Sequence, residues 1–252
     1  MAKQEKGFNP TFENGGYWEY YKDLESQFEN FLLYVPYLEG NENIYSFRLA
    51  NLILGIGAYI DSALKEVAND SYFSSKYPLM QNPIYQKGIN KGKPRNAVIY
   101  DYYPVSDEYQ LCDKFVIFKC LPKREAISPF SDFRLEAGKK KVPYWWTTYN
   151  KVKHDFSKNF KKAKLKTVRD ALAGAFLLTA IHDPSSLRLF NFGLIRPKYP
   201  PKAMWETVYD TFKGNEIYPD RPKNVNIFNP FVLETPIFLY DYEKISEKHR
   251  IP

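Results

Sequence analysis

The side chains best suited to chemistry are His154 and Asn150, which lie one helical turn apart within residues 142–156. The unperturbed pKa of histidine is near 6.5, so His154 can take or give a proton at neutral pH. We therefore take His154 as a candidate general acid or base. The neighbouring Lys153 would stabilise the charge of a phosphate anion.

Positive charge is concentrated around these residues. Residues 139–170 hold 11 lysines and arginines against Asp155 and Asp170, a net charge of +9, whereas the whole chain carries +7. The basic character of the chain therefore comes from one segment, which favours a polyanion such as RNA or a nucleotide as the ligand. The candidate contacts are Lys151, Lys158, Lys161, Lys162 and Lys164, together with Trp146 as a surface on which a base could stack.

Each of these features also has an interpretation without function. Asn150 and His154 are typical of a solvated helix face, the lysines of solvated connections, and Trp146 of aromatic packing at a helix start. Asp61 lies off the apolar stripe of its own helix. It is either a solvated or capping carboxylate, or it crosses to His154 or to a lysine and orients the site. Both interpretations remain open at the level of the sequence.

Four segments have the apolar periodicity of helices. They are residues 14–34, 43–69, 143–158 and 163–182. On a helical wheel, Tyr149, Val152 and Phe156 fall within about 40° of Trp145, whereas Asn150 and His154 lie roughly 140–180° away. We expect the first set to pack into a helical bundle. The second set should face solvent, another segment of the chain or another subunit.

The remaining segments predict a small amount of β-structure. The long connection of residues 71–142 is too long for a plain loop, and residues 97–103 and 114–121 are expected to form a hairpin over the bundle. Residues 184–252 hold half of the chain's 18 prolines. Strands at 225–228 and 231–240 would be confined by Pro230 and Pro236 to sheet edges. The predicted domains are a helical domain over 1–184, with 71–142 inserted, and an irregular appendage over 185–252 that packs on it.

Several classes of protein are not indicated by the composition. The two cysteines and three histidines have no spacing typical of a metal or redox site. The N-terminus lacks the apolar segment of a secretory leader, and no run reaches the roughly 18 apolar residues of a membrane span. We therefore expect a soluble, cytoplasmic protein that does not bind membranes.

Two blocks of the sequence resemble the HEPN-like (higher eukaryotes and prokaryotes nucleotide-binding) superfamily. One is the apolar helix at residues 45–68. The other is Ile127-Ser-Pro-Phe130, followed by Tyr-Trp-Trp-Thr-Thr-Tyr-Asn-Lys-Val-Lys-His at 144–154 and the small-residue helix at 171–181. Together they span roughly residues 43–182. The second block is similar to bacterial members that carry a Trp-Trp-x-x-Tyr-Asn-x-Val-Lys-His string.

The resemblance implies an α-helical bundle, often a homodimer in which the motif helices of two subunits face each other. Many members are metal-independent ribonucleases of toxin–antitoxin or anti-phage systems, with an arginine, a polar residue and a histidine in their signature. His154 takes the histidine place and Asn150 the polar place. The arginine place holds Tyr149, which is neutral at pH 7 and cannot clamp a phosphate as a guanidinium does.

The resemblance therefore supports two hypotheses. In the first, the chain is an RNA-directed protein of bacterial stress or phage defence that acts as a ribonuclease through His154. Asn150 would position the 2′-hydroxyl or scissile phosphate, and Asp61 would orient the site. Because a 2′-hydroxyl nucleophile needs only base, acid and anion stabilisation, we expect no metal and no other cofactor. In the second, it is a non-catalytic scaffold module that binds RNA, a nucleotide or a protein partner. Tyr149 in the arginine place favours the second hypothesis.

Overall fold

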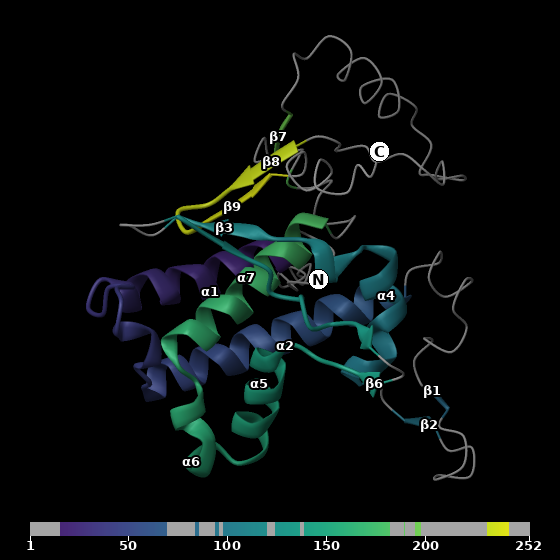
Figure 1. The fold of residues 1–252 in the computed structure, drawn as a ribbon, viewed down its shortest axis with the longest axis horizontal. Coiled ribbons are helices and arrows are strands. Elements are labelled where there is room, and N and C mark those ends of the chain that lie inside the picture. Colours follow the sequence, from purple (N-terminus) through teal and green to yellow (C-terminus); the bar gives the residue numbers. More distant parts are fainter. Residues whose placement is uncertain are drawn as a thin grey trace, which may run out of the picture.

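The chain folds around a bundle of four principal helices. The computed structural model describes residues 16–69, 84–85, 94–95, 98–119, 124–136, 139–181, 189, 195–197 and 231–241. The bundle consists of α1 (Gly16–Leu32), α2 (Phe47–Asn69), α5 (Tyr144–His154) and α7 (Leu165–Ile181). As Figure 1 shows, α1, α2 and α7 lie against one another, and α5 packs below them against α2 and α7. The predicted mainly helical fold with a small β-component is confirmed.

The second helix forms the centre of the bundle because its apolar residues fall on one face. Leu49, Ile53, Ile56 and Ile60 recur at steps of three and four, and all four are fully buried. The helix begins at Phe47, later than predicted, and residues 41–43 form a separate 3₁₀ turn, η2 (Asn41–Asn43). The Ser46 hydroxyl accepts a hydrogen bond of 3.1 Å from the Leu49 backbone N–H. This side-chain cap fixes where the helix starts.

Helix α2 is also long and apolar enough to cross a membrane, judged by length and composition alone, over Phe47–Ala68. However, 56% of its most apolar stretch is buried inside the fold, where α2 packs against α1, α5 and α7. This is the environment of a core helix in a soluble protein, which is consistent with the expected solubility.

The third predicted helix is shorter than expected. The sequence predicted residues 143–158, but α5 ends at His154, and Asp155 leaves the helical conformation with φ −150° and ψ 85°. A one-turn helix, α6 (Phe156–Asn159), and a 3₁₀ turn, η6 (Phe160–Lys162), follow. The Asp155 side chain caps α6 by accepting a hydrogen bond from the Lys158 backbone N–H. An aspartate at this position starts a new helix rather than extending the old one.

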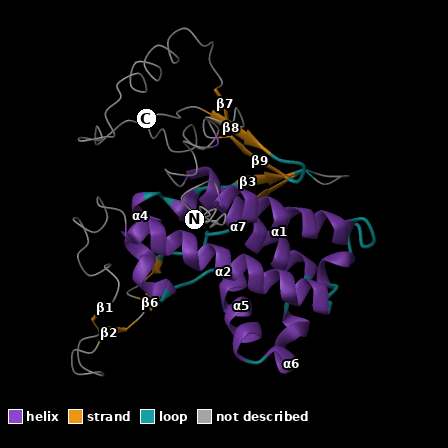
Figure 2. Ribbon diagram, turned by 180° about the vertical axis from the view of Figure 1, so that it is seen from behind, coloured by secondary structure: helices purple, strands orange, loops and turns teal. Residues whose placement is uncertain are grey.

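A five-stranded antiparallel sheet covers one side of the bundle (Figure 2). Its strands are β3 (Val116–Phe118), β4 (Glu125–Ile127), β7 (Ile195–Pro197), β8 (Phe231–Glu234) and β9 (Phe238–Asp241), in the order β4-β3-β9-β8-β7. The remaining described strands are two-residue pairs, β1 (Ile84–Tyr85) with β2 (Pro94–Arg95) and β5 (Leu135–Glu136) with β6 (Lys139–Lys140). The predicted strand at 114–121 is therefore confirmed in shorter form.

The predicted strand at 97–103 is wrong, and so is the hairpin that it was expected to form. The described part of this segment is a 3₁₀ turn, η4 (Ile99–Tyr102), and it leads into a short helix, α4 (Tyr103–Glu108). Another 3₁₀ turn, η5 (Leu111–Asp113), precedes the sheet. Pro104 occupies the first turn of α4, where its missing N–H costs nothing. The aromatic composition of the segment is used for burial against the bundle rather than for a strand.

The C-terminal strands are integrated into the sheet rather than confined to its edge. β9 lies between β3 and β8, and Pro236 stands in the turn between β8 and β9, where no ladder hydrogen bond is needed. The prediction that Pro236 forces an edge position is therefore wrong. The Phe238 ring stacks on Phe176 of α7 with ring centroids 5.6 Å apart. The strand predicted at 225–228 and Pro230 lie outside the described residues.

Candidate functional site

An open pocket runs along the outer face of α5. Its volume is about 430 Å³, which is within the usual range of small-molecule sites. Residues of η4 and of the chain just before α5 line it together with residues of α5 and α6. The lining residues are Ile99, Tyr100, Val142, Trp146, Thr147, Asn150, Lys151, His154, Asp155 and Asn159.

Helix α5 supplies the side chains of the pocket that can do chemistry. Trp145 and Val152 are fully buried on the inner face of α5, so Asn150 and His154 are turned outward and line the pocket. Asn150 is half-buried and His154 is exposed. The expected outward orientation of these two residues is therefore confirmed. The His154 ring makes no hydrogen bond or ion pair with another described residue, which leaves it available to a ligand.

Trp146 combines the two interpretations that the sequence left open. It is only 4% exposed, and its ring packs against Trp145 and Tyr149 at centroid distances of 6.0 and 5.0 Å. It also borders the pocket. Trp146 is therefore a core residue whose edge contributes to the apolar part of the pocket wall, rather than an exposed plate for base stacking.

Asp155 and Asn159 hold the polar end of the pocket in place. The Asn159 amide nitrogen donates to the backbone carbonyl oxygens of Lys151 and Asp155, at 3.0 and 2.9 Å. The pKa of the Asp155 carboxyl is lowered by the hydrogen bond from the Lys158 backbone N–H, and further by the Lys158 side chain and the Ser157 hydroxyl. Asp155 is therefore an ionised capping residue, unsuited to donate a proton at neutral pH.

Two of the four predicted catalytic residues do not reach the pocket. The ammonium group of Lys153 lies over the Tyr149 ring, 5.3 Å from its centroid, on a different side of α5 from His154. Asp61 pairs with Lys65 on its own helix at 2.5 Å and does not line the pocket. Of the four residues predicted as a catalytic set, the structure therefore brings together only Asn150 and His154.

The predicted lysine contacts form an exposed face next to the pocket. Lys151 lines the pocket itself. The others follow on α6, η6 and the start of α7: Lys158 pairs with Asp155, Lys161 lies over the Tyr45 ring, and Lys162 and Lys164 donate to Asn159 and Asn43. All five are exposed. Of these contacts only the one with Asp155 is to a carboxylate, so most of the positive charge is not neutralised. We call Lys151, Lys158, Lys161, Lys162 and Lys164 the lysine face.

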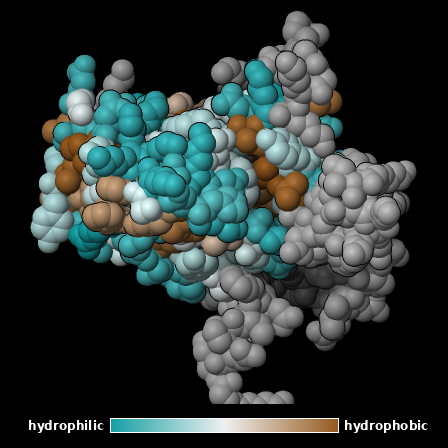
Figure 3. Space-filling view, turned by 90° about the horizontal axis from the view of Figure 1, so that it is seen from below, coloured by the Kyte–Doolittle hydropathy of each residue, from teal (hydrophilic) through white to brown (hydrophobic). Residues whose placement is uncertain are grey.

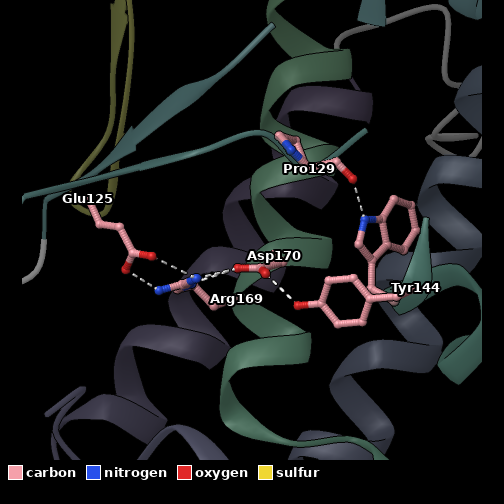
Figure 4. A network of polar contacts seen from close by, with 6 residues as sticks. Glu125, Pro129, Tyr144, Arg169 and Asp170 are labelled. Atoms are coloured by element: carbon pink, nitrogen blue, oxygen red, sulfur yellow. Dashed lines mark hydrogen bonds and ion pairs between the residues drawn. The ribbon is translucent and has the colours of Figure 1, made fainter. Parts of the chain in front are cut away.

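Arg169 belongs to the same basic segment but has a different environment (Figure 4). It is 1% exposed, and its guanidinium donates to Asp170 at 2.7 Å and to Glu125 of β4 at 2.5 Å. Tyr144 in turn donates to Asp170. Burial alone would lower the pKa of Arg169, but Asp170, Tyr37 and Glu125 outweigh it and raise that pKa. Arg169 therefore joins the sheet to the bundle and adds no charge to the surface.

Tyr149, in the place where the HEPN-like signature has arginine, is part of the bundle core. It is buried on the inner face of α5 against α2. A Cβ atom added at Gly57 would lie 2.2 Å from the Tyr149 ring, so the close approach of α5 to α2 requires glycine there. Position 149 faces away from the pocket, and a basic side chain at this position would not line it.

Comparisons with known proteins bear on the resemblance. No family model, curated protein or solved structure matches this chain. The HEPN-like resemblance, the homodimer and the link to bacterial defence therefore stay predictions. The functional argument rests on the geometry of the pocket and the lysine face.

Six of the residues that line the pocket were not predicted as site residues: Ile99, Tyr100, Val142, Thr147, Asp155 and Asn159. Ile99 and Tyr100 were assigned to a strand, and only the turn η4 brings them to α5. Asn159 was placed beyond the predicted end of the α5 helix, and the break at Asp155 turns it back toward the pocket. Asp155, a residue type favoured at helix N-caps, was the available signal for that break. The residues that line the pocket form an apolar wall with a polar rim. Such a pocket suits a ligand that has a planar ring and a charged group.

Proposed function

We propose that this protein binds single-stranded RNA along α5, α6 and η6, with one nucleotide seated in the pocket. The observation that carries the proposal is the continuity of the pocket with the lysine face. Lys151 lines the pocket, and the other lysines of the face follow on the next turns of the chain. Figure 3 views the molecule from this side, where hydrophilic residues fill the centre and hydrophobic residues flank them.

The chemistry of the site suits an unpaired nucleotide. Exposed lysines attract a phosphate backbone and hold it without reading its sequence. Ile99 and the edge of Trp146 provide an apolar wall for a base. The Asn150 amide offers both donors and an acceptor to a base edge or to a 2′-hydroxyl. An RNA duplex would keep its bases stacked and out of reach of such a pocket.

The proposal includes the setting that the HEPN-like resemblance implies. The protein would be a cytoplasmic RNA-directed component of bacterial stress or phage defence, acting as a homodimer. Sedimentation equilibrium tests the dimer directly, because one species of 29.7 kDa across the concentration range would reject it.

Binding is tested by fluorescence anisotropy with a labelled single-stranded RNA of about 15 nucleotides, a length within the footprint of known single-strand binders. The variant Asn150→Ala removes a pocket contact and is expected to weaken binding about fivefold or more, the loss of about one net hydrogen bond. Asn51→Ala, an exposed asparagine on α2, is the matched control and should bind as the wild type does. Absence of wild-type binding to RNA would end the proposal.

A second candidate function, cleavage of the bound RNA, is favoured by one observation. The His154 ring is exposed, makes no hydrogen bond or ion pair with a described residue, and lines the pocket with Asn150. As a base it would take the proton of a 2′-hydroxyl, whose oxygen attacks the adjacent phosphorus. The 5′-oxygen then leaves and is protonated by water, giving a 2′,3′-cyclic phosphate and a 5′-hydroxyl end.

Cleavage is tested with a mixed RNA pool in the presence of a chelator. Wild-type protein is expected to produce cyclic phosphate ends, and His154→Ala is expected to lower the rate by about 100-fold or more, as loss of a general base does. Binding of uncleaved RNA by His154→Ala separates the two functions. Equal rates for the wild type and His154→Ala would show that His154 is not the base.

A further inference from the structure

Three phenylalanine rings form a stack on the surface next to the pocket. Phe47 begins α2, Phe156 begins α6 and Phe160 begins η6. The Phe47 centroid lies 4.4 Å from that of Phe160 and 6.0 Å from that of Phe156. The three rings are within 20° of parallel to one another. We call Phe47, Phe156 and Phe160 the aromatic stack.

The aromatic stack is open to solvent. Phe47 is 61% exposed, and the adjacent Tyr45, whose ring meets Phe160 edge-on at 6.0 Å, is 45% exposed. Phe156 and Phe160 are partly buried, and the exposed Phe47 ring packs on them. An apolar ring held parallel to its neighbours and still exposed has a free π-face. Phe47 therefore differs from an isolated exposed side chain, because two further rings set its orientation.

The charge around the aromatic stack is positive. Lys161 lies 5.8 Å above the Tyr45 ring, and Lys162 immediately follows it on η6. Lys164 pairs in a backbone bridge with Tyr45. Each of these three lysines contacts a neutral group through its ammonium. The surroundings therefore complement a ligand that is aromatic and negatively charged at once, which describes a nucleotide chain.

One short segment of the chain, residues 154–160, contributes to both the aromatic stack and the pocket. Asn159 of α6 lines the pocket, whereas Phe156 before it and Phe160 after it belong to the stack. His154, in the pocket, precedes Phe156 by two residues. An RNA strand that places one nucleotide in the pocket and continues over α6 therefore meets the aromatic stack within a short distance along its backbone.

We propose that the aromatic stack is a platform on which an unpaired base of the bound RNA stacks, next to the nucleotide held in the pocket. The inference rests on the proposed RNA binding and names the contact that extends it. Because every base has a π-face, this platform holds RNA without sequence preference. Specificity, where there is any, comes from the pocket.

The test uses two substitutions of the exposed ring in the full-length protein. Phe47→Leu keeps an apolar side chain but removes the π-face, and Phe47→Trp keeps a π-face and adds a fluorophore. The probes are a labelled oligouridine of about 15 nucleotides and inorganic polyphosphate, which carries charge but no bases. Thermal melting by circular dichroism confirms that both variants are folded.

Phe47→Leu is expected to weaken oligouridine binding by about 5- to 150-fold, the range that loss of one base–aromatic contact produces. Its affinity for polyphosphate should equal that of the wild type. Phe47→Trp should bind oligouridine as tightly as the wild type, and its added fluorescence should be quenched by oligouridine but not by polyphosphate.

Each other outcome has a defined meaning. Unchanged oligouridine binding by Phe47→Leu, with weakened binding by Asn150→Ala, overturns the platform and keeps the proposed function. An equal loss for oligouridine and polyphosphate also overturns the platform, because Phe47 would then act on charge or structure and not on bases. Wild-type protein that binds neither oligouridine nor mixed-sequence RNA rejects both the proposed function and the platform.

Discussion

Arg169 and the lysine face come from the same basic segment of the sequence but have opposite environments. The Arg169 guanidinium is enclosed between α7 and β4, with Asp170 and Glu125 as partners. The lysines of the face are exposed and mostly contact neutral groups. The comparison shows that the net charge of a segment does not give the charge of a surface. The cation that the fold neutralises is structural, and the cations that it leaves in solvent are available to a ligand.

The difference also follows from the chemistry of the two side chains. A guanidinium is planar and presents several donors in a fixed fork, so it can satisfy two carboxylates at once when it is buried. Its carbon atom lies 4.7 Å from the Tyr37 ring centroid and 5.4 Å from that of Phe118, which adds contact with two rings. The ammonium of a lysine is strongly hydrated and stays in water. The guanidinium of Arg169 is therefore suited to its buried position, and the ammonium groups of the lysines are suited to their exposed positions.

The largest expected effect is the loss of stability when the buried Arg169 is replaced. Arg169→Met should lower the free energy of unfolding by about 3 kcal/mol or more, because it leaves Asp170 buried without its cation. Lys166→Met, an exposed cation on the same helix, is the matched control and should change stability by less than about 0.5 kcal/mol. Urea denaturation measures both. Equal stability for the two variants would remove the distinction between structural and surface cations.

A smaller effect concerns a buried carboxylate for which no cation is recorded among the described residues. Glu25 of α1 accepts hydrogen bonds from Tyr21 and Thr235, the latter in the turn between β8 and β9. Burial raises the pKa of the Glu25 carboxyl, and the hydrogen bonds from Thr235 and Tyr21 oppose that shift. The stability that this carboxyl contributes is therefore fully present below its unfolded pKa and lost as pH rises through its raised folded pKa.

Thr235→Val removes one of these donors and should raise the pKa of Glu25 further. The loss in free energy of unfolding should therefore grow with pH. We expect about 1 kcal/mol at pH 4, where the carboxyl and the lost hydrogen bond are neutral, and about 1.5 to 3 kcal/mol above the raised folded pKa, where the lost hydrogen bond is to a carboxylate. Thr235→Ser keeps the hydroxyl and is the control. Urea denaturation between pH 4 and 8 that gives a pH-independent loss would contradict this account.

The smallest effect on stability is expected when exposed lysines of the lysine face are replaced. The triple variant Lys161→Ala/Lys162→Ala/Lys164→Ala should change the free energy of unfolding by less than about 1 kcal/mol in total, because contacts of exposed lysines contribute little. Urea denaturation at pH 7 checks this against the wild type. A loss comparable with that of Arg169→Met would place these lysines in the structural class and weaken the case for an RNA-binding surface.

The bundle was predictable from the sequence because its signal is periodic. The stripe of α2 and the inner face of α5 follow from the spacing of their apolar residues alone. The strand predicted at 97–103 failed because aromatic and β-branched residues fit a buried turn as well as a strand. Only the first-turn position of Pro104 favoured the helix α4. The central place of β9 depends on pairing with β3, more than a hundred residues away, and no local pattern encodes it.

The candidate site was predictable only in part for the same reason. The helical wheel places Asn150 and His154 together because both belong to one helix. The partners of Asp61 and Lys153 depend on side-chain directions within helices, where Lys65 and Tyr149 are their neighbours one turn away. The burial of Arg169 depends on Glu125, which reaches it from the sheet. Local neighbours on the same helix therefore decided the places of Asp61 and Lys153, and a contact between distant segments decided that of Arg169.

The central claim, that the lysine face binds the RNA backbone, is tested most directly by the salt dependence of binding. Affinity of the wild type for single-stranded RNA should fall linearly on a logarithmic plot against salt, by about 0.7 in slope for each phosphate neutralised. The Lys161→Ala/Lys162→Ala/Lys164→Ala variant should show a slope smaller by about 2. A flat response of the wild type, or the same slope for both proteins, would contradict the account.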